Sequence, residues 1–180
     1  MTLRERLQRA VRPSATRSGA VLWAKSLLNA VLFFAIFMVA LPWLFDRVLP
    51  MALSPAGAFR RGLAAALAGV GIAGWIACLD LFSRKGRGTP LPADAPRRLV
   101  TSGLFARSRN PIMTAELLVI WAEAVYLGSL GVTLYALAIS ALAHASVVYV
   151  EEPELRRRFG QPYDDYCARV PRWLPRLRVS

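Results

Sequence analysis

Three ionisable side chains lie inside long apolar runs of this sequence, where a charge is costly and is usually paired or functional. Glu116 and Glu123 are seven residues apart and share a helix face, and His144 is the one histidine of the chain. Counted from the turn Gly128-Ser-Leu-Gly131, Glu116 and His144 fall at similar depth in an antiparallel hairpin. We therefore predict a Glu116–His144 hydrogen bond, with Glu123 deeper and able to reach Tyr135. A structural clasp is the favoured interpretation, and a role with substrate is the alternative.

A second polar group lies at the ends of the same two apolar runs. Arg107, Arg109 and Asn110 precede one run, and Glu151 and Glu152 follow the other. A helical hairpin would bring these ends together, where a carboxylate can form charge-assisted hydrogen bonds to hydroxyl or ammonium groups. From composition alone, solvated charges at a helix boundary are the favoured interpretation.

The elements that must position these groups are membrane helices. Of the 180 residues, 56% are hydrophobic, and the mean hydropathy of +0.40 exceeds that of an ordinary soluble domain. Apolar residues cluster in 21–45, 62–79 and 112–150, the last divided at residues 128–131. Runs of this length can cross about 30 Å of hydrocarbon. We predict an all-α polytopic membrane protein with about four spans, a C-terminal helical hairpin and a cytoplasmic C-terminal helix.

The division of the chain follows from these runs. We expect a single membrane domain over residues 1–180: a basic interfacial segment in 1–20, two spans in 21–82, and a polar loop, the hairpin and a tail in 83–180. A signal peptide is the rival interpretation of the first run, but its apolar stretch is too long for one. Cys78 lies inside a span and Cys167 in the tail, so neither a disulfide nor a metal site is expected.

The basic residues gather on one side of the predicted spans. The formal net charge is +12, and 20 of the 23 Lys and Arg residues fall in 1–25, 83–110 and 151–180, which four crossings place together. The positive-inside rule then predicts that this side is the cytoplasm and that both termini lie there. The membrane we expect is a bacterial inner membrane. Anionic lipid headgroups are the expected partners of this charge. The sequence has no basic groove interleaved with aromatic residues, so we expect no nucleic acid partner.

Local signals mark the ends of the predicted helices. Asn110 can cap the third span, and Pro111 suits its first helical position. Pro153 is expected to kink the fourth span, Gly160 to end it and Pro162 to start a short helix. In the second span, small residues at four-residue steps predict a ridge for close packing of a neighbouring helix or a second copy of the chain: Ala65, Gly69, Ala73 and Ala77.

Short motifs in the second half of the chain follow a fixed order. They are Gly88-Thr-Pro-Leu-Pro92, Leu99-Val-Thr-Ser-Gly103, Arg109-Asn-Pro111, Glu151-Glu-Pro-Glu-Leu155, Phe159-Gly160, Tyr163, Tyr166 and Val170-Pro-Arg-Trp-Leu-Pro175. Their order and spacing over residues 84–176 resemble the isoprenylcysteine carboxyl methyltransferase and phospholipid methyltransferase superfamily.

The resemblance implies a membrane methyltransferase whose S-adenosylmethionine pocket opens to the cytosol. Its lipophilic acceptor, an isoprenylcysteine-like carboxylate or a phospholipid-like amine, would enter from the bilayer. Carried over by position, the cofactor contacts are Arg97, Arg98, Leu99, Val100, Phe105, Asn110, Pro111, Ile112, Met113 and Glu151. We assign catalytic roles to Arg109, Asn110 and Glu152, and substrate contacts to Glu116, His144 and Val147.

Several positions depart from the pattern that the resemblance implies. Val147 stands where the carboxyl methyltransferases have a substrate-contacting arginine, and Phe105 and Met113 stand where tyrosine is frequent. Asn110 replaces the histidine of the prenylcysteine enzymes, and Asn-Pro is more like the phospholipid N-methyltransferases. The acceptor is therefore open among a carboxylate, an amine, a thiol and a hydroxyl.

Two other classes of protein fit part of the sequence. A sterol-type membrane reductase, which would use a nicotinamide cofactor, has a similar C-terminal arrangement to Tyr166, Cys167 and Val170-Pro171. A non-catalytic membrane module is the other alternative, and it is motivated by Met113 and Val147.

Overall fold

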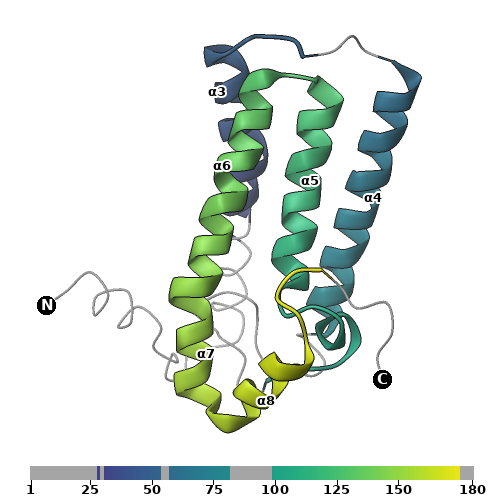
Figure 1. The fold of residues 1–180 in the computed structure, drawn as a ribbon. Helices are drawn as coiled ribbons and strands as arrows, with labels where there is room; N and C mark the ends of the chain where they lie inside the picture. Colours follow the sequence, from purple (N-terminus) through teal and green to yellow (C-terminus); the bar gives the residue numbers. More distant parts are fainter. Residues whose placement is uncertain (1–27, 29–30, 54–56, 82–98, 175–180) are drawn as a thin grey trace, which may run out of the picture.

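The computed structural model describes residues 28, 31–53, 57–81 and 99–174, and the elements of this part are helical. Helices α3, α4, α5 and α6 stand side by side, while α7 and α8 extend from one end of the bundle (Figure 1). The predicted all-α membrane fold is confirmed. The predicted interfacial segment 1–20 and the residues Arg97 and Arg98 lie outside the described residues.

Three helices in the described part of the chain are long and apolar enough to cross a membrane: Val31–Val48, Ala58–Leu81 and Leu130–Phe159. Helix α5 (Pro111–Leu127) has 17 residues, which is the short end of the range for a spanning helix. It runs alongside α4 and α6 (Figure 1). The protein is thus a helical membrane protein, and α5 is the shortest of the four predicted crossings.

The first described helix is not regular along its length. It passes through a π-helical turn, η1 (Ile36–Ala40), before it ends as α3 (Leu41–Val48). The Tyr135 hydroxyl of the neighbouring helix donates to the Phe37 carbonyl oxygen at 2.6 Å, within this turn. Met38 and Tyr135 both belong to the largest apolar core cluster, so this contact anchors the first helix to the hairpin.

The hairpin turn forms where the glycines predict it. Helix α5 ends at Leu127, and α6 (Leu130–Ser146) begins three residues later. Gly128 has a φ of 60°, a left-handed conformation that glycine adopts without steric cost. The Ser129 hydroxyl accepts a backbone N–H of α6 as its cap. The Gly128 carbonyl oxygen also accepts the Leu53 N–H at 2.7 Å, which ties the turn to the preceding loop.

Small residues bring α4 (Ala58–Leu81) and α5 together, but they are not the ones that were predicted. The buried face of α4 carries Ala64, Gly71 and Cys78. A Cβ atom on Gly71 would lie 2.8 Å from the Ala115 carbonyl oxygen. The predicted ridge of Ala65, Gly69, Ala73 and Ala77 is exposed instead. As a prediction of internal packing the ridge was wrong, because small residues occur on more than one face of this helix.

The helix that carries the paired glutamates changes geometry at that point. Helix α6 continues through a π-helical turn, η5 (Val147–Glu151), into α7 (Glu152–Phe159). The turn ends two residues before Pro153, which has no backbone N–H to donate. Gly160, with a φ of 59°, ends α7, and α8 (Gln161–Arg169) follows. The predicted helix end at Gly160 and the short helix after it are confirmed.

Candidate active site

A buried carboxylate joins three segments at the end of the bundle that carries α7 and α8. Glu152 is only 4% exposed. Arg172 holds it in a bidentate pair, with Nε donating to Oε1 at 2.7 Å and Nη2 donating to Oε2 at 3.0 Å. Arg109 Nη1 lies 2.9 Å from the same Oε1. Two guanidinium groups therefore compensate one carboxylate that has little contact with water.

The loop before α5 is tied to the segment after α8 by its backbone. The Arg109 N–H donates to the Pro171 carbonyl oxygen at 2.9 Å. The Asn110 side-chain amide and the Ser108 hydroxyl both donate to the Arg172 carbonyl oxygen, at 3.1 Å and 3.3 Å. Figure 1 shows this segment returning from α8 to the lower end of α5. Asn110 precedes the helix as predicted, but its side chain forms no cap, because its amide holds this segment.

Helix α8 also contacts the loop before α5. The Tyr166 hydroxyl donates to the Phe105 carbonyl oxygen at 2.7 Å, and burial raises the pKa of this tyrosine. Arg109 Nη1 also donates to Cys167 Sγ at 2.9 Å. Arg109 Nε is buried and has no hydrogen-bond partner in the described part of the chain. One N–H donor of this guanidinium is therefore unsatisfied within the described residues.

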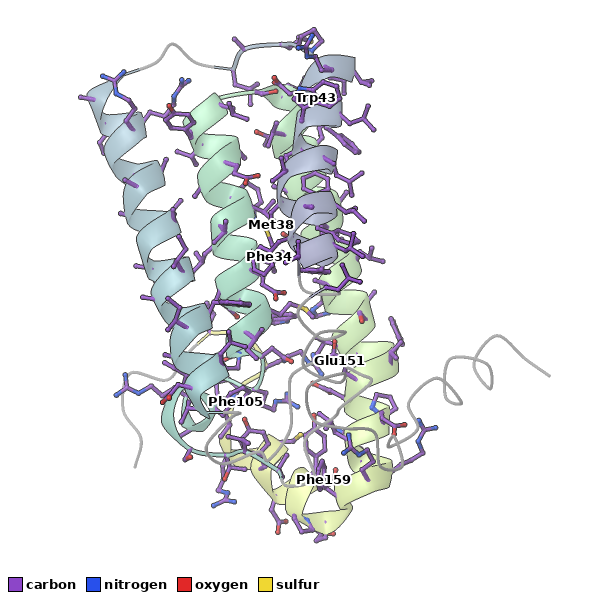
Figure 2. The ribbon with its side chains drawn as sticks, turned by 180° about the vertical axis from the view of Figure 1, so that it is seen from behind. Phe34, Met38, Trp43, Phe105, Glu151 and Phe159 are labelled. Carbon is purple, nitrogen blue, oxygen red and sulfur yellow. The ribbon has the colours of Figure 1, made fainter. Side chains whose placement is uncertain are left out.

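Glu151, adjacent to Glu152 in the sequence, has a different environment. The Ser146 hydroxyl hydrogen-bonds its carboxylate, and Glu116 of α5 is close enough to interact with it electrostatically. No ion pair of Glu151 is found within the described residues. Glu151 lies toward the same end of the bundle as Phe105 and Phe159, and Trp43 lies at the other end (Figure 2).

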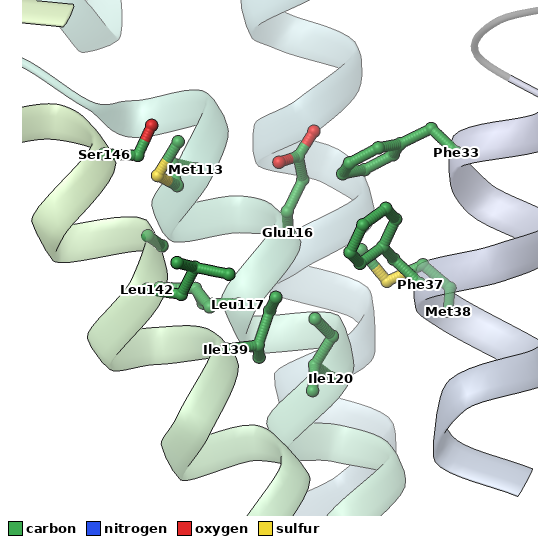
Figure 3. A pocket seen from close by; sticks show the side chains of 11 residues that line it. Phe33, Phe37, Met38, Met113, Glu116, Leu117, Ile120, Ile139, Leu142 and Ser146 are labelled. Carbon is green, nitrogen blue, oxygen red and sulfur yellow. The ribbon is translucent and has the colours of Figure 1, made fainter. Parts of the chain in front are cut away.

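An apolar pocket of about 160 Å³ lies between the first helix, α5 and α6. Phe33, Phe37 and Met38 form one wall, and Leu117, Ile139 and Leu142 are among the residues facing them (Figure 3). Two polar side chains line it, Glu116 and Ser146, and Met113 lies beside Ser146 (Figure 3). Through Ser146 the polar end of the pocket adjoins Glu151.

Comparison with known proteins now identifies the family. Residues 62–162 match the model of the phospholipid methyltransferase family, which covers more than half of the chain. The chain belongs to this family. It is also 36% identical over 91 residues to methanethiol S-methyltransferase 2 of Bradyrhizobium diazoefficiens. The aligned region is 51% of this chain and 33% of that relative, so the chain spans about a third of the relative's length.

The family match includes α5, α6 and α7 and therefore both groups of ionisable residues that the sequence singled out. The structure brings Arg109, Asn110 and Glu152 together at one end of the bundle. Arg109 and Glu152 bind each other, and Asn110 binds the segment after α8. In the described part of the chain, the contacts of Arg109, Asn110 and Glu152 hold the loop before α5 in place. The catalytic roles predicted for these three residues stay predictions.

The predicted Glu116–His144 hydrogen bond is wrong. Glu116 is hydrogen-bonded by Trp75 of α4, and His144 Nδ1 accepts from Trp173 Nε1 at 3.0 Å, so the two do not pair. The number of residues between a side chain and the turn does not fix the rotation of each helix about its axis. The Tyr135 hydroxyl donates to the Phe37 carbonyl oxygen, and Glu123 lies close enough to Tyr135 to interact with it electrostatically, as predicted.

The predicted cofactor residues divide into two sets in the described part of the chain. Val100, Phe105 and Ile112 pack together in an apolar cluster against α4, and Leu99 packs against Tyr163 and Tyr166 of α8. Pro111 is buried at the start of α5. By contrast, Met113 lines the pocket, and Glu151 adjoins it.

Of the three predicted substrate residues, only one lines the pocket. Glu116 lines the pocket, whereas Val147 is fully buried and the exposed His144 is not among the lining residues.

Sequence reasoning missed four residues of the site: Ser146, Trp75, Arg172 and Trp173. Arg172 and Trp173 lie inside the quoted motif Val170-Pro-Arg-Trp-Leu-Pro175, which was the available signal. Arg172 binds Glu152, 20 residues earlier, and Trp173 binds His144, 29 residues earlier. Helical periodicity does not predict contacts between residues so far apart in the sequence. Ser146 and Trp75 carry no sequence signal, because serine and tryptophan are ordinary inside membrane helices.

Proposed function

We propose that the protein is an integral membrane methyltransferase that transfers a methyl group from S-adenosylmethionine to a lipophilic acceptor. The observation that supports this proposal is that an apolar pocket and an acidic side chain meet at residues within the family match. An apolar pocket ends at Glu116 and Ser146, and Glu151 borders that end. One end of the site therefore suits an apolar molecule, and the other suits a charged nucleoside.

The residues present fit such a donor. Glu151 has only the Ser146 hydroxyl as a partner among the described residues and can accept from ribose hydroxyls or an ammonium group. Arg109 Nε, buried without a partner in the described part, would be satisfied by a carboxylate of the donor. Arg97 and Arg98 remain predicted partners of the same group.

Methyl transfer mainly requires that the donor and the acceptor are held in the correct relative position. When bound, S-adenosylmethionine supplies a methyl group on a positively charged sulfur, and the displacement is in line with the attacking atom. Protein residues contribute by holding the reactants in line and by excluding water. Here the network of Glu152, Arg109 and Arg172 fixes the loop, and the apolar walls of the pocket exclude water from the acceptor.

The acceptor belongs to this proposal as well. The apolar lining favours a lipophilic molecule that enters from the bilayer, with an isoprenylcysteine-like carboxylate and a phospholipid-like amine as the candidates that the sequence suggested. The relative's name adds a small thiol as a third. We further propose that the site faces the cytoplasm of a bacterial inner membrane, beside anionic lipid headgroups that match the basic segments.

Donor binding tests the proposal directly. In lipid nanodiscs, the protein should bind S-adenosylmethionine and its demethylated product S-adenosylhomocysteine in a calorimeter. Glu151→Ala should weaken this binding by roughly 1.5 to 3 kcal/mol, because a hydrogen bond to a charged group is lost. Glu154→Ala is the matched control, since Glu154 pairs with Arg157 on the surface of the same helix.

Three results would contradict parts of this proposal. Unchanged affinity in Glu151→Ala removes that residue from the site. Absence of any donor binding favours the non-catalytic module. Stabilisation by a nicotinamide cofactor, with no effect of S-adenosylmethionine, favours the reductase.

A further inference from the structure

The lining of the apolar pocket restricts which acceptor chemistry it can hold. Glu116 is the ionisable residue among the lining side chains. Its described hydrogen bond comes from the side chain of Trp75, a group that can only donate. A carboxylate offers about four acceptor sites, so one hydrogen bond leaves Glu116 able to accept from a molecule in the pocket.

Among the described residues, the two ionisable groups at this end of the pocket, Glu116 and Glu151, are both acidic. Glu116 and Glu151 interact electrostatically, and both are partly buried between helices. At the low effective dielectric of a protein interior, like charges repel each other more strongly than in water. A carboxylate acceptor would therefore be the third negative group in a small space, whereas a cationic sulfonium beside it would be attracted.

We propose that Glu116 selects a small, neutral, proton-bearing acceptor, such as an alkyl thiol, and accepts its proton during methyl transfer. This inference rests on the proposed function and deepens it by choosing among the acceptor classes. It excludes the carboxylate acceptor that the resemblance implied.

The charges balance in this step. A lone pair on the acceptor atom forms the new bond to the methyl carbon, and the carbon–sulfur bond of the sulfonium breaks with its electron pair left on sulfur. The proton of the acceptor passes to the Glu116 carboxylate. A negative and a positive group thus become two neutral ones, and an apolar pocket favours such a loss of charge.

The size of the pocket agrees with a small acceptor. At about 160 Å³ it is smaller than the range of roughly 300 to 1,000 Å³ that holds a drug-sized ligand. A short alkyl chain fits among Phe33, Phe37 and Leu142, with its reactive end at Glu116.

Acceptor binding without any methyl donor is the first test. Hexanethiol and hexanoate, which share a chain length, are titrated calorimetrically into the full-length protein in zwitterionic nanodiscs, with empty nanodiscs subtracted. The wild type should bind the thiol at least tenfold more tightly than the carboxylate. Glu116→Gln should reduce this preference to under threefold, mainly because hexanoate binds better.

Glu123→Gln is the matched control, because Glu123 lies on the same helix and does not line the pocket. It should keep the wild-type preference. An unchanged preference in Glu116→Gln, or an equal change in both variants, would overturn the inference.

Methyl transfer is the second test. Glu116→Gln should methylate hexanethiol at least about 100-fold more slowly, which is the lower end of what a general base contributes. Its affinity for S-adenosylhomocysteine should be unchanged. If Glu116→Gln binds the donor normally and its rate is unchanged, only the role of Glu116 is overturned. If the wild type does not bind the donor, the proposed function is overturned.

A third variant tests the pocket while Glu116 is retained. Ala143 lines the pocket, and Ala143→Leu should fill part of it and weaken hexanethiol binding at least tenfold. Unchanged binding in this variant would place the acceptor elsewhere and overturn the inference even if Glu116→Gln did not fold.

Discussion

At the residue scale, the adjacent Glu151 and Glu152 have different surroundings because successive side chains of a helix point in different directions. Glu152 lies among arginines, and its carboxylate is compensated by two guanidinium groups. Glu151 adjoins the pocket through Ser146 and has no cation among the described residues. The π-helical turn ends at Glu151, and α7 begins at Glu152. Within the described residues Glu152 holds the loop in position, and we propose Glu151 as the residue that binds a ligand.

Removing Glu152 should destabilise the protein. Glu152→Ala leaves Arg109 and Arg172 without their shared partner, and breaking a buried ion pair of this kind costs about 3 to 5 kcal/mol. Because Arg172 is partly exposed, we expect the lower end of this range. The measurement is the unfolding free energy or the thermal midpoint in detergent.

Glu154→Ala is again the control for stability, since its surface pair with Arg157 contributes at most about 1 kcal/mol. Adding Arg172→Ala to Glu152→Ala should recover part of the loss, because one uncompensated cation disappears. If Glu152→Ala is no less stable than Glu154→Ala, the network does not hold the loop.

At the element scale, the contact between α4 and α5 positions Trp75 against Glu116. The two helices approach closely at Gly71, where the backbone of Ala115 leaves no room for a methyl group. Ala115 directly precedes Glu116, so the same contact sets the height of the carboxylate relative to Trp75. Close helix packing is thus part of how the pocket is built.

Gly71→Ala should separate these helices or strain them. A Cβ atom there would lie 2.8 Å from a backbone oxygen, and overpacking of this kind costs roughly 1 to 3 kcal/mol. The thermal midpoint should fall, and Trp75 fluorescence should change in a variant whose other tryptophans are replaced by phenylalanine. Gly69→Ala is the matched control, because a Cβ atom there meets nothing within 4 Å. Equal effects of the two substitutions would show that the close approach at Gly71 is not needed.

At the scale of the whole molecule, Glu151 lies toward the end of the bundle that carries Phe105 and Phe159 (Figure 2). The ionic network is built on the adjacent Glu152, and the polar end of the pocket adjoins Glu151 through Ser146. The same end of the bundle also carries α8, and the loop with Met51 lies at the end that holds the hairpin turn. The distribution of basic residues predicts that the α8 end faces the cytoplasm.

Cysteine labelling of intact bacterial cells tests this orientation. Met51→Cys and Ala168→Cys place exposed thiols at opposite ends of the bundle, in a background with Cys167→Ser. Cys78 is fully buried and should stay unlabelled. A membrane-impermeant maleimide should label Met51→Cys in intact cells and Ala168→Cys only after the inner membrane is opened. The reverse pattern would contradict the predicted orientation.

The sequence by itself determined the class of the fold and the ends of its helices. Long apolar runs have one stable outcome in a bilayer, because every backbone polar group must be paired within the span. Pro111, Gly128 and Gly160 act on the backbone where they stand, so the hairpin and the break before α8 could be predicted locally. The ordered motifs likewise predicted the family.

Only the tertiary structure decided which side chains meet. The rotation of a helix about its axis is set by packing against all its neighbours at once, and no spacing along one segment contains it. For this reason Glu116 pairs with Trp75 rather than His144, and the close contact falls at Gly71 rather than Gly69. The partnership of Glu152 with Arg172 likewise depends on a segment that returns from beyond α8, since a long-range contact follows from the path of the chain and not from its local sequence.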